Sequence, residues 1–106
     1  MIVTQGSPAL ACFGSLWDIE LVALALNGEA RFDGFQRQLG ISRKVLSARL
    51  KYMVEQGIFE RHRYQFRPER YEYRLTDKGQ ELRPVVESAT AWSSRWYPDA
   101  ARTPKG

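Results

Sequence analysis

The chain has 106 residues, 43% of them hydrophobic, and a formal net charge of +4 at pH 7, which suits one domain with a single core. No segment reaches the roughly 20 apolar residues of a membrane-spanning helix, no secretory signal is recognisable, and the single cysteine supplies neither an internal disulfide nor a zinc site. We therefore expect a cytoplasmic protein without a cofactor, a metal ion or a membrane partner.

Two helices are predicted in the first part of the chain. Ser15 and Asp18 have the spacing of a capping box, with Asp in place of the usual Glu or Gln, and they begin a largely apolar helix over about Leu16 to Leu26. A shorter helix is predicted over Asp33–Leu39, and Gly40 ends it. The apolar first helix should therefore be central, with the second packed beside it.

The segment from Ser42 to Gln56 predicts an amphipathic helix, with Ser42 as its N-cap and Gly57 as its terminator. Its apolar stripe comprises Leu46, Leu50, Met53 and Val54. Lys44, Ala48 and Lys51 lie on the opposite side, and Arg43 and Ser47 flank that side. Such a face suits a DNA major groove, because lysine reaches phosphates and guanine edges while alanine lets the backbone approach. A merely solvated surface is the alternative.

After Gly57 the apolar period changes from helical to two. Ile58–Tyr64 and Arg70–Leu75 predict two strands, joined by a polar connection over Gln65–Glu69. Alternation places Tyr71 and Tyr73 inward, as core residues. A basic hairpin directly after a helix-turn-helix pair predicts a wing, for which the candidate DNA-binding residues are Arg63, Arg67 and Arg70.

The positive charge is concentrated in this part of the chain. Residues 42–74 hold nine basic and four acidic side chains, a net +5, whereas the remainder holds seven basic and eight acidic ones, a net −1. A basic patch of this kind is the electrostatic signature of a polyanion partner, although a surface kept basic for solubility is also compatible with it.

Thr76 is predicted to cap a last helix, which extends to Trp96 with a kink at Pro84. Large apolar residues beyond a small core predict an interface on the helix over 76–97; the alternative is that the helix folds back on its own domain. The residues expected at this interface are Val85, Val86, Ala89, Trp92 and Trp96. We expect a flexible arm over 1–7, one domain over 8–97 and a disordered tail over 98–106.

No catalytic constellation is recognisable, so an enzyme is not expected. His62 is the only histidine, and no cysteine partner or triad residue lies near it in the sequence. It is interpreted as a surface or base-stacking residue. No phosphate-binding or dinucleotide-binding motif is present.

Over residues 8–97 the chain resembles the HxlR-type transcriptional regulators, a branch of the MarR-like winged helices. Two stretches carry the resemblance most specifically, ISRKVLSARL over 41–50 and YRLTDKG over 73–79, together with Trp17, Arg31-Phe32, Leu39, Gly57 and Trp92. The resemblance implies an α+β, mainly α, winged helix-turn-helix fold with a C-terminal dimerisation helix. It also implies a homodimer that binds double-stranded DNA at a roughly palindromic operator.

The functional prediction is a sequence-specific transcriptional regulator, a repressor acting by steric competition, whose recognition helix contacts DNA through Ser42, Arg43, Lys44, Ser47 and Lys51. The alternative is a protein-interaction module whose basic face binds an acidic partner. A small-molecule or redox effector is envisaged. Cys12 is either a buried structural residue or a redox sensor; the sensing cysteine of several family members would instead align near Thr4.

Overall fold

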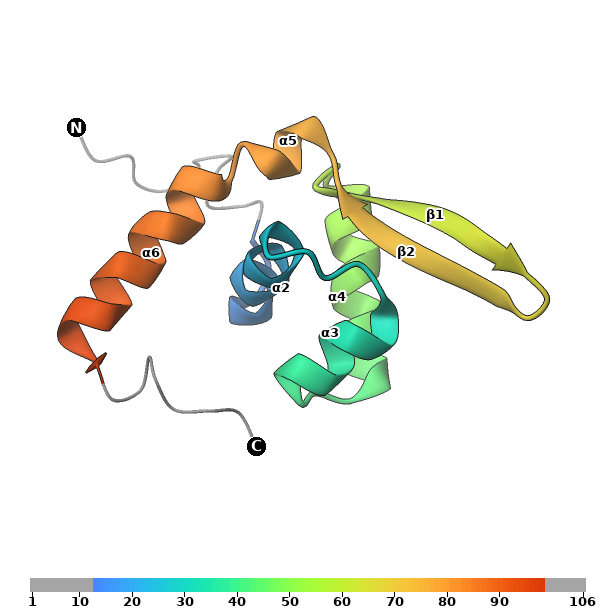
Figure 1. Ribbon diagram of the computed structural model, residues 1–106, viewed down its shortest axis with the longest axis horizontal. Coiled ribbons are helices and arrows are strands. Elements are labelled where there is room, and N and C mark those ends of the chain that lie inside the picture. The colour runs from blue at the N-terminus through green and yellow to red at the C-terminus, as the bar shows by residue number, and fades with distance from the viewer. Residues whose placement is uncertain (1–12, 99–106) are drawn as a thin grey trace.

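The computed structural model describes residues 13–98, and the expected arm over 1–7, Cys12 and all of the expected tail but Pro98 lie outside them. The chain order is two helices, a third and longer helix, a two-stranded antiparallel hairpin and two further helices (Figure 1). Their bounds are α2 Leu16–Leu26, α3 Phe32–Leu39, α4 Arg43–Glu55, β1 Phe59–Phe66, β2 Glu69–Leu75, α5 Asp77–Gln80 and α6 Arg83–Trp96. The predicted α+β, mainly α, winged helix-turn-helix fold is confirmed. No helix within residues 13–98 is long and apolar enough to cross a membrane.

The core lies where α2, α3 and α4 meet the base of the hairpin. Each element contributes the apolar side chains that its periodicity places on one face, as predicted for Leu46. The buried apolar residues are Leu21, Val22, Phe35, Leu46, Leu50, Met53, Ile58, Phe59 and Val86. Figure 1 shows α2 between α6 on one side and α3 and α4 on the other, so the apolar α2 is the central helix, as expected.

Two glycines fix the ends of the helix-turn-helix pair. Gly40 follows α3 with φ 69°, and Gly57 follows α4 with φ 76°, and both values belong to the left-handed region that favours glycine. Between the two helices, the Ser42 side chain accepts a hydrogen bond from Val45 N at 3.1 Å and so begins α4. The sequence therefore determines both the turn and the length of α4.

The hairpin is longer than predicted and its connection is shorter. Phe66 pairs with Glu69, so only Arg67 and Pro68 separate the strands, where a connection over Gln65–Glu69 was expected. The register passes from Arg63↔Tyr71 to Gln65↔Arg70, which leaves Tyr64 as the extra residue of a β-bulge. Polar residues extend the pairing because a solvent-exposed hairpin needs no apolar alternation to form its hydrogen bonds.

The predicted single helix from Asp77 to Trp96 is wrong, because two helices occupy this stretch. Helix α5 ends at Gln80, and α6 begins in a new direction at Arg83 (Figure 1). Pro84 lies in the first turn of α6, where its missing N–H has no helical partner to lose. In a continuous helix the same proline would lose its bond to the Gln80 carbonyl and clash with it, so the chain breaks rather than kinks.

Candidate nucleic-acid interface

The outer face of α4 presents unpaired cations to solvent. Lys44, Ser47 and Lys51 are all exposed, and Ala48 lies exposed among them. Within residues 13–98, neither lysine has an ion-pair or hydrogen-bond partner. The opposite face is anchored in the core by Leu46, Leu50 and Met53. The helix therefore offers free positive charge on a rigid support, which is what a phosphate or base-edge contact requires.

Arg43, at the start of α4, is exposed but not free. Its guanidinium lies 4.6 Å from the centre of the Phe32 ring, and its Nη1 is 3.6 Å from Asp33 Oδ1. The side chains are 69% and 72% exposed, so water screens this ion pair and it contributes little. Arg43 can exchange Asp33 for a phosphate at small cost.

A buried ion pair fixes α4 against α2. Asp18 is fully buried, and its carboxylate accepts from Arg49 Nε at 2.9 Å and Arg49 Nη2 at 2.8 Å. The same carboxylate accepts from Gly14 N and Ser15 N, which completes the predicted capping box. The hydrogen bonds to Asp18 raise the pKa of Arg49 above its ordinary value. Arg49 therefore orients α4, whereas its lysines remain available for a partner.

The sequence could indicate only half of this pair. On a helical wheel, Arg49 lies on the side of α4 that faces the domain. Its partner Asp18 is 31 residues away, and no local sequence pattern predicts this contact. Asp18 was expected only as a capping residue, because nothing in the sequence indicates that its side chain is buried.

The three wing arginines that were predicted to bind DNA differ in their surroundings. Arg63 Nη1 lies 2.7 Å from Glu69 Oε2, so its charge is paired within the hairpin. Arg67 and Arg70 have no ion-pair partner among residues 13–98. Tyr71 was expected in the core, but it lies outside it and is partly exposed. The Arg61 guanidinium lies over the Tyr71 ring, 4.2 Å from the ring centre. Its strand has already left the core at that position, whereas Tyr73 still packs against it.

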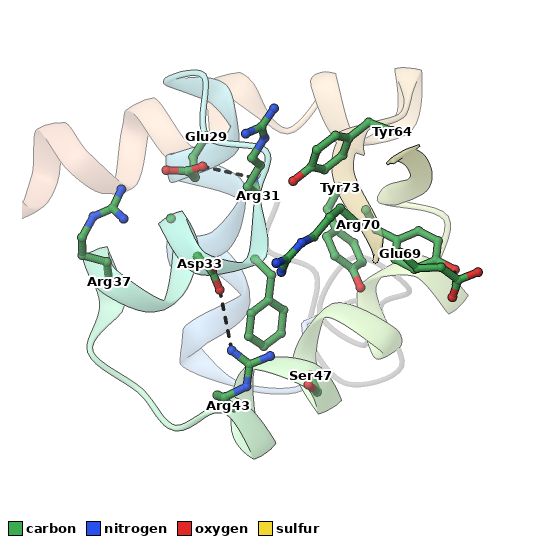
Figure 2. A pocket seen from close by; sticks show the side chains of 13 residues that line it. Glu29, Arg31, Asp33, Arg37, Arg43, Ser47, Tyr64, Glu69, Arg70 and Tyr73 are labelled. Atoms are coloured by element: carbon green, nitrogen blue, oxygen red, sulfur yellow. Dashed lines mark hydrogen bonds and ion pairs between the residues drawn. The ribbon is translucent and has the colours of Figure 1, made fainter. Parts of the chain in front are cut away.

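A groove of ≈580 Å³ lies between the start of α3, the first turns of α4 and the wing (Figure 2). Arg43 and Ser47 line it from α4, and Arg70 points into it from the wing. Two arginines that were not predicted as site residues, Arg31 and Arg37, also line it. The fold thus brings predicted residues of the recognition helix and the wing to one depression, together with cations from the short helix.

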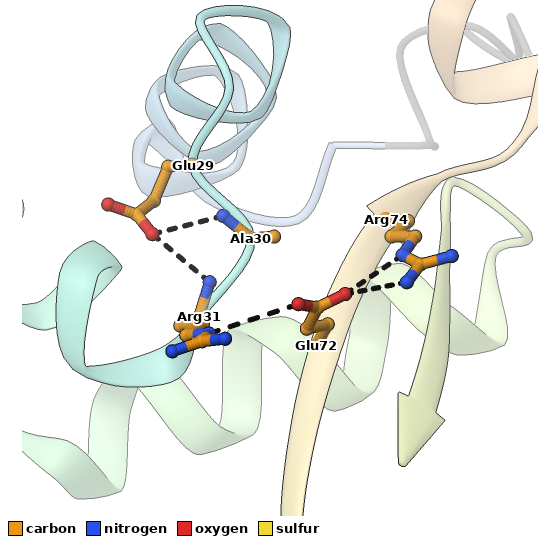
Figure 3. Close-up of polar contacts among 5 residues, drawn as sticks. All are labelled: Glu29, Ala30, Arg31, Glu72 and Arg74. Carbon is orange, nitrogen blue, oxygen red and sulfur yellow. Dashed lines mark hydrogen bonds and ion pairs between the residues drawn. The ribbon is translucent and has the colours of Figure 1, made fainter. Parts of the chain in front are cut away.

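Polar contacts tie the base of the wing to the segment before α3 (Figure 3). Glu72 accepts from Arg74 Nη2 at 2.7 Å, and its other oxygen lies 3.8 Å from Arg31 Nε. Glu29 in turn accepts from the backbone N–H groups of Ala30 and Arg31. The backbone of Arg31 also forms an isolated antiparallel β-bridge with Glu72. The wing is therefore held at its base, while its tip projects freely.

The residues expected at a dimer interface divide into two sets. Val86 is 7% exposed and packs into the protomer's own core, so it is unavailable to a partner. The other four, Val85, Ala89, Trp92 and Trp96, are all exposed, and their spacing places them on one side of α6. Trp92 and Trp96 are 57% and 63% exposed, although Trp92 has an edge contact with Tyr97. Part of the helix therefore folds back, and part presents an uncovered apolar stripe.

His62 lies on the wing with its Nε2 3.6 Å from Glu60 Oε1, and both side chains are substantially exposed. Across the described part of the chain, no group of three or more His, Cys, Asp or Glu residues could hold a metal ion.

The family model of the HxlR-like helix-turn-helix regulators matches residues 12–101. The chain belongs to the HxlR-like helix-turn-helix family. The predicted resemblance is therefore confirmed, and the match spans α4 and the wing described above.

Two curated relatives and one solved structure illustrate the similarity. An uncharacterized HTH-type transcriptional regulator of Mycobacterium tuberculosis is 39% identical over 90 residues, which cover 85% of this chain and 57% of that protein. YvaP of Bacillus subtilis, another HTH-type transcriptional regulator, is 37% identical over 81 residues, 76% of this chain and 75% of YvaP. The redox regulator HypR in its oxidized form superposes with a TM-score of 0.76 at 30% identity over 82% of this chain and 91% of HypR. The chain spans little more than half the length of the mycobacterial relative.

Proposed function

We propose that this protein is a DNA-binding transcriptional regulator that reads its operator with α4. The observation that carries the proposal is the solvent-facing set of Lys44, Ser47 and Lys51, unpaired cations around a serine on a helix anchored by core packing and by the Asp18–Arg49 pair. In this proposal Lys44 and Lys51 contact base edges in the major groove, while Arg43 and the Ser42-capped end of α4 lie near phosphate. Arg67 and Arg70 add backbone contacts beside the groove.

The regulator is proposed to act as a homodimer. The exposed stripe of Val85, Ala89, Trp92 and Trp96 on α6 supports this, because tryptophans are typical anchors of protein interfaces. A two-fold dimer would place two copies of α4 about one DNA turn apart, ~34 Å, on a roughly palindromic operator. Bound across a promoter, such a dimer represses by steric competition.

An effector would act by changing the spacing of the two recognition helices. HypR is named a redox regulator, which supports testing a thiol response in this chain. Cys12 is the only thiol, and its role as a redox sensor stays a prediction. Diamide should release DNA from the wild-type protein; unchanged release from Cys12→Ser would exclude Cys12 as the sensor.

The proposal that the protein binds DNA is tested by measuring the affinity of the wild-type protein for random and for promoter-derived duplex DNA over a series of salt concentrations. We expect binding to both at low salt, with a logarithmic affinity that falls linearly with the logarithm of the salt concentration, and tighter binding to the promoter at higher salt. Absence of DNA binding at low salt would favour the alternative, a module that binds an acidic protein.

A further inference from the structure

The wing ends in an exposed aromatic side chain that the alternation of the sequence does not single out. Phe66 is 70% exposed, the highest value among the large apolar side chains of residues 13–98. It is the last residue of β1, directly before the Arg67-Pro68 turn. A phenyl ring at the tip of a basic hairpin has no core to pack against, so its position suggests an external contact.

The bulge at Tyr64 decides where this ring points. Arg63 pairs with Tyr71, and the next pairs are Gln65 with Arg70 and Phe66 with Glu69. Because one extra residue reverses the alternation of faces, Phe66 joins Arg63 on one face of the hairpin. An unbulged strand would place Phe66 on the opposite face.

Arg63 and Glu69 hold the ring in place. The Arg63 guanidinium lies 4.4 Å from the centre of the Phe66 ring, and its Nη1 is 2.7 Å from Glu69 Oε2. Since Glu69 already satisfies the charge of Arg63, this arginine has less to offer a phosphate than a free one. One side of the ring is covered by the guanidinium, and the rest is open.

The surroundings indicate the chemistry of the partner. Arg67 follows Phe66 directly and has no ion-pair partner in the described structure, whereas Arg70, opposite Gln65, lies on the other face of the hairpin. An apolar ring next to a free cation matches a surface that is apolar at its walls and anionic at its edges. The minor groove of DNA has that character, with sugars between two rows of phosphates, and phenylalanine is among the side chains that proteins place there.

We propose that Phe66 packs against the deoxyribose walls of the minor groove where the wing meets the operator, with Arg63 as its positioning residue. This inference rests on the proposed function. It assigns the wing tip an apolar role beside the electrostatic one of Arg67. The contact reads groove width and the absence of the guanine amino group rather than a base sequence.

The test uses the duplex that the wild-type chain selects from a random pool, and fluorescence anisotropy as the measure of affinity. Phe66→Ser should weaken binding roughly threefold to tenfold, the size of one aromatic contact, and leave the salt slope unchanged because no charge is removed. Arg67→Ser is the matched control, and should also lower the slope, by up to about 0.9 because one phosphate is no longer neutralised. Both positions lie at the exposed tip, so circular dichroism should be unchanged.

A second arm replaces the base pairs under the wing. Inosine–cytosine pairs resemble A·T in the minor groove, whereas G·C pairs add an amino group there. The loss on Phe66→Ser should persist with A·T and inosine–cytosine and shrink with G·C. Equal affinity of Phe66→Ser and wild type on the A·T duplex would overturn the inference, as would a loss of self-association in place of DNA affinity. A wild-type chain that binds no duplex would overturn the proposed function as well.

Discussion

Asp18 connects three parts of the molecule through one carboxylate. It caps α2, it accepts from the backbone of Gly14 and Ser15, and it neutralises Arg49 on α4. Because Asp18 is fully buried and the Arg49 side chain is only 19% exposed, removing one charge would leave the other poorly solvated. The position of α4, the proposed recognition helix, therefore depends on a residue outside that helix.

Asp18→Asn should lower the free energy of unfolding by about 2–4 kcal/mol, because the amide retains a capping acceptor but loses the charge that compensates Arg49. Urea denaturation measures the change. Glu87→Gln is the control, since the Arg83–Glu87 pair is mostly exposed and its loss should cost less than about 0.5 kcal/mol. Equal effects of the two substitutions would contradict the role assigned to Asp18.

Individual side chains also show what the sequence could and could not predict at the site. The charge count located the basic surface, and the helical wheel separated Lys44 from Arg49. Neither could tell that Arg63 is paired with Glu69 whereas Arg70 is free, because that depends on strand register. The register depends on a bulge at Tyr64 for which the sequence has no evident signal.

Among the elements, the short helix α5 begins directly after the wing because Thr76 caps it. Its hydroxyl lies 2.6 Å from the Gly57 carbonyl oxygen, to which it donates, and it accepts from Gly79 N at 3.0 Å. Lys78 Nζ adds a hydrogen bond to the Gln56 carbonyl oxygen at 2.7 Å. Helix α5 thus closes the C-terminal end of α4, which carries the proposed reading face.

Thr76→Val keeps the shape of the side chain and removes the hydroxyl. We expect it to lower the free energy of unfolding by about 1–2 kcal/mol, through the loss of an N-cap and of a part-buried hydrogen bond. Thr90→Val, at an exposed position of α6, is the matched control and should change stability by less than about 0.5 kcal/mol. Thermal or urea unfolding of both variants checks this, and a neutral Thr76→Val would contradict it.

The elements themselves were largely predictable, because caps and glycines mark their ends. Ser15, Ser42 and Thr76 each accept a hydrogen bond from the first turn of the helix that follows, as their residue types predicted. The break before α6 and the length of the hairpin were the exceptions. Pro84 is compatible with a kink or with a new first turn, and the structure has the new first turn, with Val86 packed against the core.

In the whole molecule, α6 has two faces that differ in burial. Val86 joins the core, whereas Trp92 and Trp96 lie uncovered on the side of α6 away from it. In the single chain this apolar stripe is exposed to water, and a second copy of the chain would cover it. Because the proposed dimer forms through this stripe, its geometry would set the spacing of the two α4 helices.

Trp92→Ser should leave the fold intact and shift the protein from dimer to monomer. Truncation of a buried aromatic anchor commonly costs at least about 2 kcal/mol, so we expect a dimer dissociation constant roughly 30-fold or more higher. Sedimentation velocity over a concentration series measures it. Ser94→Ala, on the opposite side of α6, should behave as wild type, and equal behaviour of Trp92→Ser and wild type would exclude this face.

In the proposed function, the free lysines of α4 read DNA from a helix that is anchored by its other face, and the DNA affinity of Lys44→Ala measures this reading. The affinity of this variant should be compared on selected and on random duplexes at one salt concentration, with Arg67→Ala as control. We expect Lys44→Ala to lose about 1–3 kcal/mol on the selected duplex and less on random DNA, whereas Arg67→Ala weakens both about equally. Wild-type affinity and preference in Lys44→Ala, with the fold unchanged by circular dichroism, would contradict the placement of α4 in the major groove.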